Sequence, residues 1–360
     1  MKKKWNKIVA CALALGVAVS ISSCGTQQTP TADKPLAGTT LKVYNWGEYI
    51  DEDVIGMFEE ETGIKVIYDT FETNEDMYTK IKSSGTNNYD VCIPSDYMIK
   101  KMIDEDMLEK IDFNNVPNYS YIDKKYTKQT FDPNDEYSVP YMWGTVGIAV
   151  NKEMVSEPID SWQVLWDPKY KKQILGLDSE RDAVGLTLKA LGYSLNSTDP
   201  AQLEEAKQKL IEQKPNILAY VGDQVKDKML NGEAAMALLW SGDGITLKYS
   251  DDRFDYVLPK EGTNFWIDSI VILKGTQNKA GAEAFINFLC RPDIGLKNAE
   301  YIGYCTPNTE TFAQLDDELK NDKSAYPDEE YLSKCEIFEN LADDEIMQTY
   351  SKIWLDVLSE

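Results

Sequence analysis

The chain has 360 residues, of which 37 are lysine or arginine, 61 are aspartate or glutamate and none is histidine, giving a formal net charge of −24. This balance argues against a nucleic-acid partner, because phosphate binding needs clustered basic side chains. The lack of histidine excludes Ser–His and Cys–His catalysis and histidine-ligated metals, and the cysteines lack the close spacing of a zinc site. We therefore expect no metal and no cofactor.

The N-terminal residues have the pattern of a secretory signal peptide. A lysine-rich start precedes an apolar run, Ile8–Ile21, that suits a signal-peptide core and is short for a membrane span. The run leads into Ser-Ser-Cys, which resembles a bacterial lipobox, so we expect residues 1–23 to be removed and Cys24 to carry diacylglycerol. Cleavage nearby without lipidation is the alternative. Residues 24–39, rich in Gly, Pro and Thr, predict a flexible tether between membrane and folded body.

Strands and helices alternate in the segment that follows. Short apolar runs predict strands, and runs with one apolar helical face predict helices, in the order 41–46, 51–63, 64–71, 74–84 and 89–94. Gly63 marks the end of the first helix. The last run is nearly all apolar, as expected of a parallel strand buried on both faces. This βαβαβ order predicts an open parallel sheet.

A second α/β series follows a long extended segment. Residues 137–151, YSVPYMWGTVGIAVN, predict two extended stretches around Trp143 and Gly144, long enough to cross from one lobe to another. The next elements are expected to be a strand at 173–178, a helix at 182–192, a strand ending in a turn at 234–243, an extended run at 265–273, an amphipathic helix at 279–293 and a closing helix at 343–360. The amphipathic helix would bury Ala282, Phe285, Ile286 and Leu289.

The body of the chain is too long for one ordinary hydrophobic core, so we expect two α/β lobes. We place lobe 1 at residues 40–145 and 267–312. Lobe 2 would comprise residues 146–266 and 313–360.

Ligands of open parallel sheets bind beyond the carboxyl ends of the strands. Five segments are expected at such ends: Trp46-Gly47-Glu48-Tyr49, Ser95-Asp96-Tyr97, the run from Asp178 to Asp182 that includes Ser179, Trp240-Ser241-Gly242-Asp243, and Trp266-Ile267-Asp268. Every segment carries an acid, four carry an aromatic residue, and Arg181 is the single basic residue among them.

This combination suits a positively charged ligand. Tryptophan and tyrosine faces attract ammonium groups by about 0.5–2 kcal/mol, and carboxylates add charge-assisted hydrogen bonds. Each feature also has an ordinary explanation: Trp46, Trp240 and Trp266 could be core residues, and the acids could favour helix N-termini or turns. Their coincidence at five positions favours a cation site and leaves ordinary packing open.

The chain contains six segments of distinctive sequence: YNWGEYI, FEEETGIKVIYDTFETNEDMYTKI, YDVCIPSDYMIKKM, YSVPYMWGTVGIAVN, FWIDSIVI and RPDIGLKNAEYIGYCTPN. They resemble the spermidine/putrescine-binding proteins of bacterial polyamine ABC transporters, from about Leu41 to the C-terminus. The resemblance implies a type II periplasmic-binding-protein fold whose two lobes close on putrescine or spermidine without enzymatic chemistry. It also implies delivery of the ligand to a membrane permease. With Cys24 lipidated, we expect an extracytoplasmic monomer anchored to the cell membrane.

The resemblance also assigns residues to the ligand site. They are Trp46, Gly47, Glu48, Tyr49, Ser95, Asp96, Tyr97, Asp182, Trp240, Trp266, Asp268 and Tyr304. Asp182 would face the inner part of the polyamine. Asp268 would clamp a terminal amine between aromatic walls.

Several positions bear on the length of the polyamine. Ser179 stands where spermidine-preferring relatives carry an additional acid, and Phe338 aligns loosely with a glutamine of those relatives. Asp243 stands where putrescine-preferring relatives have an aspartate. These positions favour the shorter diamine and Glu48 favours spermidine, so both ligands remain open. Cys305 stands where a proline is commoner and would perturb its loop.

Two other functions fit parts of the pattern. A carbohydrate receptor would stack aromatic rings on sugars, although five acids with one arginine are very anionic for that purpose. A glycosidase would use two carboxylates such as Glu48 and Asp182 as acid and base.

Four cysteines remain after the signal peptide and Cys24: Cys92, Cys290, Cys305 and Cys335. Outside the cytoplasm they allow one or two disulfides. Their spacing indicates no particular pairing.

Overall fold

The computed structural model describes residues 30–341 and 344–360. The predicted signal peptide and Cys24 lie outside the described residues. The end of the predicted tether packs on the fold: Ala37 is 2% exposed, and the Gly38 N–H donates a 2.9 Å hydrogen bond to the Gly63 carbonyl. The folded body therefore begins slightly before Thr40.

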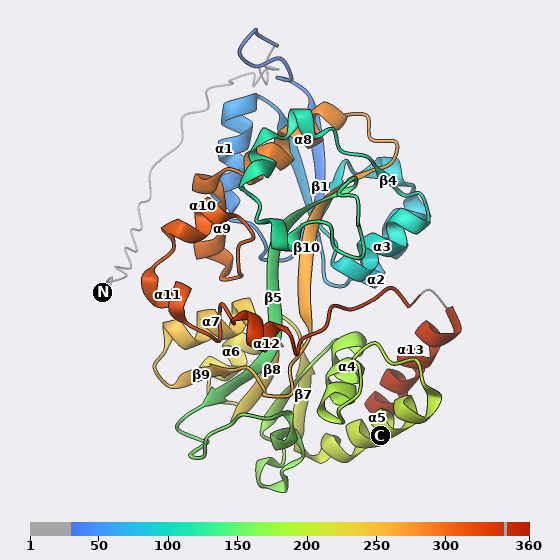
Figure 1. Ribbon diagram of the computed structural model, residues 1–360, viewed down its shortest axis with the longest axis vertical. Helices are drawn as coiled ribbons and strands as arrows, with labels where there is room; N and C mark the ends of the chain where they lie inside the picture. Colours follow the sequence, from blue (N-terminus) through green and yellow to red (C-terminus); the bar gives the residue numbers. More distant parts are fainter. Residues whose placement is uncertain (1–29, 342–343) are drawn as a thin grey trace, which may run out of the picture.

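A ten-stranded β-sheet runs through the whole molecule (Figure 1) in the order β2-β1-β3-β10-β5-β8-β6-β7, with β4 paired to β10 and β9 to β5. The strands are β1 Thr40–Trp46, β2 Lys65–Phe71, β3 Val91–Cys92, β4 Leu108–Glu109, β5 Ser138–Asn151, β6 Ile174–Leu177, β7 Ile217–Val221, β8 Met236–Trp240, β9 Phe254–Val257 and β10 Phe265–Leu273. β1 pairs in parallel with β2 and β3, as the βαβαβ pattern predicts. The sheet as a whole is mixed, because β10 pairs antiparallel with β3, β4 and β5.

The first helices are α1 Glu52–Thr62, α2 Asn74–Ser84 and α3 Asp96–Asp104. α1 and α2 agree closely with the predicted ranges because their ends carry strong capping signals. The Asp51 side chain accepts a hydrogen bond from the Asp53 N–H, and Thr73 accepts one from Asp76. Gly63 ends α1 in the left-handed conformation, with φ of 73°.

Two antiparallel strands, β5 and β10, connect the two halves of the molecule (Figure 1). All fourteen residues of β5 are buried. Its first half pairs with β10, and its second half pairs with β8 and β9. The predicted extended crossing is confirmed, but it is one uninterrupted strand and not two stretches around Trp143 and Gly144, because each half of the sheet continues its hydrogen bonding.

The lower half in Figure 1 contains β6–β9 and the helices α4 Glu180–Ala190, α5 Pro200–Gln213, α6 Val225–Leu230 and α7 Ser241–Ser250. The turn predicted after Trp240 is instead the first turn of α7. Gly242 and Asp243 are typical turn residues, but Ile245 and Leu247 are buried and hold the segment as a helix.

The last helices are α8 Lys279–Leu289, α9 Pro292–Ile302, α10 Thr309–Gln314, α11 Asp317–Asn321, α12 Glu329–Leu332 and α13 Asp344–Ser359. α8 buries Ala282, Phe285, Ile286 and Leu289, as predicted. α8–α10 lie in the upper half with α1–α3, and the chain then returns to the lower half, where α13 packs on α4 and α5 (Figure 1).

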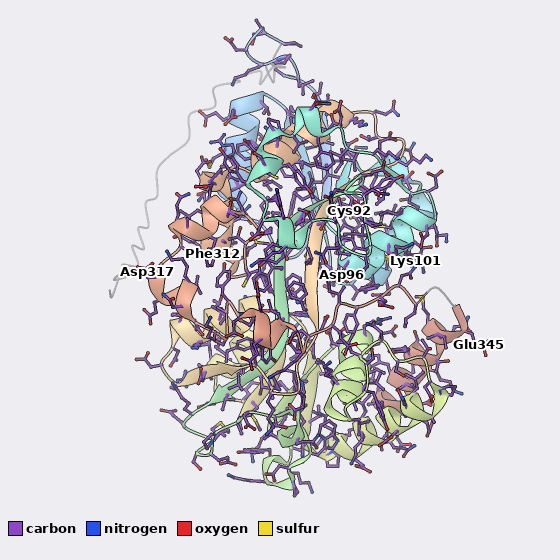
Figure 2. The ribbon with its side chains drawn as sticks, viewed as in Figure 1. Cys92, Asp96, Lys101, Phe312, Asp317 and Glu345 are labelled. Atoms are coloured by element: carbon purple, nitrogen blue, oxygen red, sulfur yellow. The ribbon has the colours of Figure 1, made fainter. Side chains whose placement is uncertain are left out.

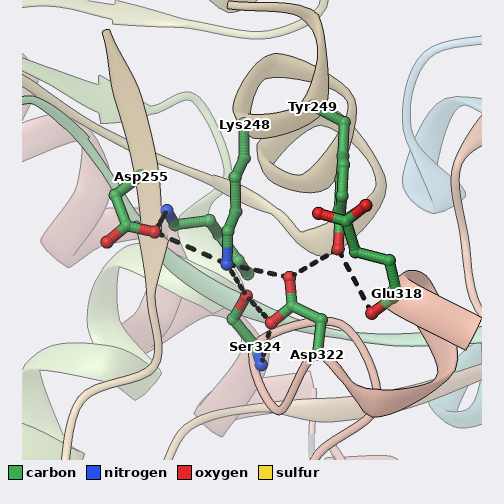
Figure 3. Close-up of polar contacts among 7 residues, drawn as sticks. Lys248, Tyr249, Asp255, Glu318, Asp322 and Ser324 are labelled. Carbon is green, nitrogen blue, oxygen red and sulfur yellow. Dashed lines mark hydrogen bonds and ion pairs between the residues drawn. The ribbon is translucent and has the colours of Figure 1, made fainter. Parts of the chain in front are cut away.

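A polar network fastens the returning segment to α7 (Figure 3). Lys248 Nζ lies 2.8 Å from Asp322 Oδ2 and 3.5 Å from Asp255 Oδ1, and it donates a 3.0 Å hydrogen bond to Ser324 Oγ. The Tyr249 hydroxyl donates to Asp322 at 3.1 Å. The network fixes the end of α7 opposite to Asp243.

Gly144 lies where β5 passes Trp266. A Cβ atom at Gly144 would lie 2.6 Å from Trp266 Cζ2 and 2.5 Å from Ser241 Oγ, both on buried residues. Gly144→Ala should therefore lower the free energy of unfolding by about 1–3 kcal/mol, measured by urea titration. Gly56→Ala in α1 is the control, since a Cβ there meets nothing within 4 Å, and it should stabilise by up to about 1 kcal/mol. Equal effects of the two changes would contradict the packing argument.

Candidate ligand-binding site

A cavity of about 720 Å³ lies where the upper and lower halves meet. Every residue of the predicted site lines it: Trp46, Gly47, Glu48, Tyr49, Ser95, Asp96, Tyr97, Ser179, Asp182, Trp240, Asp243, Trp266, Asp268 and Tyr304. These residues come from separate segments of the chain, so the fold brings them together. Their contact with a ligand stays a prediction.

The loop after β1 forms part of the upper wall. Glu48 has φ of 49°, a left-handed conformation that costs a non-glycine residue on the order of 1–3 kcal/mol. The Tyr141 hydroxyl donates a 2.9 Å hydrogen bond to the Tyr49 carbonyl and holds the next residue in place. Asp51 caps α1, so helix capping does not account for Glu48. The loop directs Glu48 and Tyr49 to the cavity at some cost in backbone strain.

Asp268 lies beside a group of aromatic rings. The Tyr304 ring centroid is 5.4 Å from that of Tyr49 and 5.2 Å from that of Trp266. Burial raises the pKa of Asp268 to about 7, and the hydroxyls of Ser95 and Tyr49 lie close enough to oppose part of this rise without a well-aligned hydrogen bond to Oδ1. Among the described residues, Asp268 Oδ1, the Tyr49 hydroxyl and Trp266 Nε1 are buried without a hydrogen-bond partner. Since unpaired buried polar atoms are costly, this wall suits a ligand that donates to Asp268.

Trp266 and Asp268 lie inside β10 and not after the end of a strand, so that part of the prediction is wrong. They reach the cavity because β10 crosses between the halves, with an irregular register between Asp268 and Ser269. A bridge between Asp268 and Ser95 then brings β10 next to the segment that follows β3.

Asp96 has a structural task at the cavity wall. Its carboxylate accepts hydrogen bonds from the backbone N–H groups of Tyr97, at 2.7 Å, and Ile267, at 3.2 Å. Burial raises the pKa of Asp96 to about 8, with a further contribution from Asp268, and these two hydrogen bonds oppose the rise. Asp96 thus ties the start of α3 to β10, near the middle of the molecule (Figure 2).

Asp182 lies on the lower wall, in the first turn of α4. It accepts a 2.8 Å hydrogen bond from Ser179 Oγ and a 3.4 Å one from Asn264 Nδ2. Burial raises the pKa of Asp182 to about 6 against the effect of these donors. Ser179 also caps α4 by accepting a hydrogen bond from the Asp182 N–H. Ser179 therefore holds both the backbone and the carboxylate of Asp182 in place.

Four charged residues of the cavity wall were not predicted from the sequence: Glu72, Glu75, Asp223 and Lys226. Asp223 and Lys226 follow β7, whose sequence ILAYV was not recognised as a strand. Placing a strand there would have marked Gly222-Asp223 as a further strand end. Arg181, the base that was noted, stacks its guanidinium 4.6 Å from the Phe338 ring and 5.4 Å from the Tyr97 ring.

Negative charge predominates around the cavity. Its wall carries two basic side chains, Arg181 and Lys226, and ten carboxylates: Glu48, Glu72, Glu75, Asp96, Asp178, Glu180, Asp182, Asp223, Asp243 and Asp268. A cleft lined mainly by one sign of charge raises the local concentration of the opposite ion. The geometry therefore suits a small organic cation with apolar stretches.

Cys92, Cys290, Cys305 and Cys335 are free thiols, so no disulfide forms among these four. Residues 30–341 and 344–360 contain no cluster of acidic or cysteine side chains suited to a metal ion. None of the helices in these ranges combines the length and apolar character needed to cross a membrane.

Comparison with known proteins identifies the family. The chain matches the family model of bacterial extracellular solute-binding proteins over residues 53–327. The spermidine/putrescine-binding periplasmic protein of Salmonella typhimurium is 40% identical over 337 residues, covering 93% of each chain.

Solved structures agree with this assignment. The PotD substrate-binding protein of a spermidine/putrescine ABC transporter from Streptococcus pneumoniae has 44% identity and a TM-score of 0.79, covering 89% of this chain and 99% of its own. A PotD lipoprotein of Treponema pallidum has 27% identity and a TM-score of 0.79, covering 88% and 99%. These similarities confirm the predicted type II periplasmic-binding-protein fold with two α/β lobes. The chain therefore belongs to the bacterial extracellular solute-binding proteins, and its relatives there include the spermidine/putrescine-binding proteins that its sequence motifs resemble.

Proposed function

We propose that this protein captures putrescine or spermidine outside the cytoplasm and delivers it to the permease of an ABC transporter. The observation that carries the proposal is the buried, unpaired Asp268 Oδ1 beside the rings of Tyr49, Trp266 and Tyr304. An ammonium group would complete the hydrogen bonding of Asp268 and lie against the aromatic faces. The methylene stem of a polyamine suits the apolar ring surfaces. Relatives named as spermidine/putrescine-binding proteins support this ligand class.

The proposed lobes are residues 40–145 with 267–312, and residues 146–266 with 313–360. The hydrophobic clusters support this division. Two clusters use buried residues from 41–143 and 267–305. Three others draw on 146–256, Ala325 and 341–357. Closure of the lobes about β5 and β10 would enclose the ligand and remove water from its ion pairs.

The protein would be a monomer held at the membrane by lipid on Cys24 after removal of residues 1–23. The lipoprotein of Treponema pallidum supports an anchored form within the family. The membrane anchor would keep the binding protein close to its permease. This raises the effective concentration of the binding protein at the permease.

Binding without chemistry is favoured over hydrolysis. The relatives are named as binding proteins, and Glu48, one of the two carboxylates considered for a glycosidase, lies 3.3 Å from Lys226 Nζ. The relatives also favour a polyamine over a carbohydrate.

Calorimetric titration tests the proposal. The mature chain, with Cys24→Ser to prevent lipidation, would be refolded to remove carried-over ligand and titrated with putrescine, spermidine and uncharged sugars at two salt concentrations. We expect heat from a polyamine and a lower affinity at high salt, because ion pairing is screened. No heat from either polyamine, with refolded protein shown to be native, would refute the proposal. Salt-independent sugar binding would replace it by a carbohydrate receptor.

A further inference from the structure

Lys226 places an ammonium group in the cavity. Its Nζ lies 2.9 Å from Asp243 Oδ1 and 3.3 Å from Glu48 Oε2. The Lys226 and Asp243 side chains are 29% and 15% exposed, whereas that of Glu48 is 71% exposed. Salt screens a shielded pair less than an exposed one. Lys226 is therefore held mainly by Asp243 on its own half of the molecule, with Glu48 as a weaker partner from the other half.

The surroundings of Lys226 favour a positive charge. Burial, Asp243 and Glu48 together raise the pKa of Asp223, which also lines the cavity. Burial opposes protonation of Lys226, but Asp243 and Glu48 outweigh it and raise the pKa of the lysine. This end of the cavity thus combines one ammonium group, that of Lys226, with the carboxylates of Glu48, Asp223 and Asp243.

The ring of Tyr304 links this cluster to Asp268. A Cβ atom at Gly242, next to Asp243, would lie 2.6 Å from carbons of the Tyr304 ring. Burial raises the pKa of Tyr304, and Asp243 and Asp268 both add to the rise. The two acids are therefore neighbours of one ring. A polyamine anchored at Asp268 and extended past Tyr304 would meet Asp243, where the Lys226 ammonium already stands.

Arg181 is a second internal cation, on another part of the cavity wall. Burial and Glu75 raise the pKa of Glu180, and Arg181 opposes this rise. Arg181 thus neutralises part of the charge of those acids. Asp268 differs from the acids beside Lys226 and Arg181, since within the described residues its Oδ1 has no hydrogen-bond partner.

We propose that Lys226 is a specificity-determining residue that occupies the ammonium position at Asp243 and thereby favours a diamine over a triamine. The inference rests on the proposed polyamine binding. Lysine ends in a methylene and a primary ammonium, as putrescine and spermidine do, so Lys226 satisfies Asp243 as a ligand would. A diamine can use Asp268 and Asp182 and leave Lys226 in place. The third ammonium of a triamine must displace Lys226 or bind beside it against like-charge repulsion.

The test compares neutral substitutions at two lysines of α6. Lys226→Met removes the internal cation, and Lys226→Gln is a second neutral variant of different packing. Lys228→Met is the matched control: it removes the same charge from the same helix, where Lys228 lies 3.0 Å from Glu233 and outside the cavity wall. Affinities for putrescine and spermidine would be measured by calorimetry on the mature chain, with native folding checked by circular dichroism.

Both Lys226 variants should raise the affinity for spermidine relative to putrescine by about tenfold or more. Lys228→Met should leave this ratio within about twofold, because the net charge changes without altering the cavity. An unchanged ratio in both Lys226 variants, or an equal shift in Lys228→Met, would overturn the role of Lys226 and leave polyamine binding intact. Absence of polyamine binding in the unsubstituted protein would instead refute the proposed function, and this inference with it.

Discussion

Asp268→Asn should weaken polyamine binding by about 2–4 kcal/mol, which is about 30- to 1,000-fold in the dissociation constant. The substitution keeps the size of the side chain but removes the negative charge that would face a buried ammonium group. Calorimetry on the two proteins measures the difference. Asp317→Asn is the control, because the Asp317 side chain is 90% exposed at the outer edge of the molecule (Figure 2). An unchanged affinity in Asp268→Asn would remove Asp268 from the binding site.

The stability of the ligand-free variant separates a loss of binding from a loss of folding. Burial raises the pKa of Asp268 to about 7 in the folded protein, compared with about 3.9 in an unfolded chain. Above that folded value the charged group destabilises the ligand-free fold. Asp268→Asn should therefore unfold no more easily than the unsubstituted protein at about pH 8. Weaker binding combined with unchanged or higher stability would identify an electrostatic role.

Local signals made the first elements of the fold predictable. Residues 51–63 and 74–84 combine apolar helical faces with Asp51, Gly63 and Thr73 at their ends, and the structure ends the helices there. Most of the cavity residues were predictable for a related reason. Parallel strands place the residues after their carboxyl ends along one edge of the sheet, which accounts for Glu48, Asp96 and Asp182. Trp266 and Asp268 lie inside β10, so only the sequence motifs identified them, together with Tyr304, for a reason that holds.

The remaining features depend on contacts between distant segments. Gly242, Asp243 and Gly244 have turn chemistry, and only burial of Ile245 and Leu247 in the lower half makes the segment helical. β7 is a run of five apolar residues, ILAYV, and periodicity alone does not distinguish so short a run from part of a buried helix. The position of Lys226 after a strand was therefore not recognised. The ion pair between Lys226 and Glu48 joins residues 178 positions apart in the chain, and no local pattern indicates it.

Acidification should weaken polyamine binding over the range in which the cavity carboxyl groups take up protons. Burial is the largest cause that raises the pKa of Asp268, to about 7, and of Asp182, to about 6. Aliphatic amines titrate near pH 10, so the ligand keeps its charge throughout this range. Below the two folded values, an ammonium group must displace a proton from each carboxyl group before it can pair. Between about pH 8 and about pH 5.5 the affinity should fall by about 100-fold, with up to tenfold per pH unit for each proton released.

The ligand-free protein should respond to pH in the opposite direction. Because the folded pKa values of Asp268 and Asp182 lie above their unfolded values, the folded state holds more protons between about pH 4 and about pH 7. The stability contributed by these groups is full at low pH and is lost as pH rises through their folded values. Burial raises the pKa of Asp96 to about 8, so Asp96 also contributes to the loss of stability as pH rises.

Calorimetry in buffers of different ionisation enthalpy would count the protons released on binding, and thermal unfolding would measure the stability of the ligand-free protein. Asp268→Asn should show a shallower pH dependence of affinity, because one of the two titrating groups is gone. A pH-independent affinity in the unsubstituted protein would contradict the view that buried carboxylates in this cavity hold the ligand.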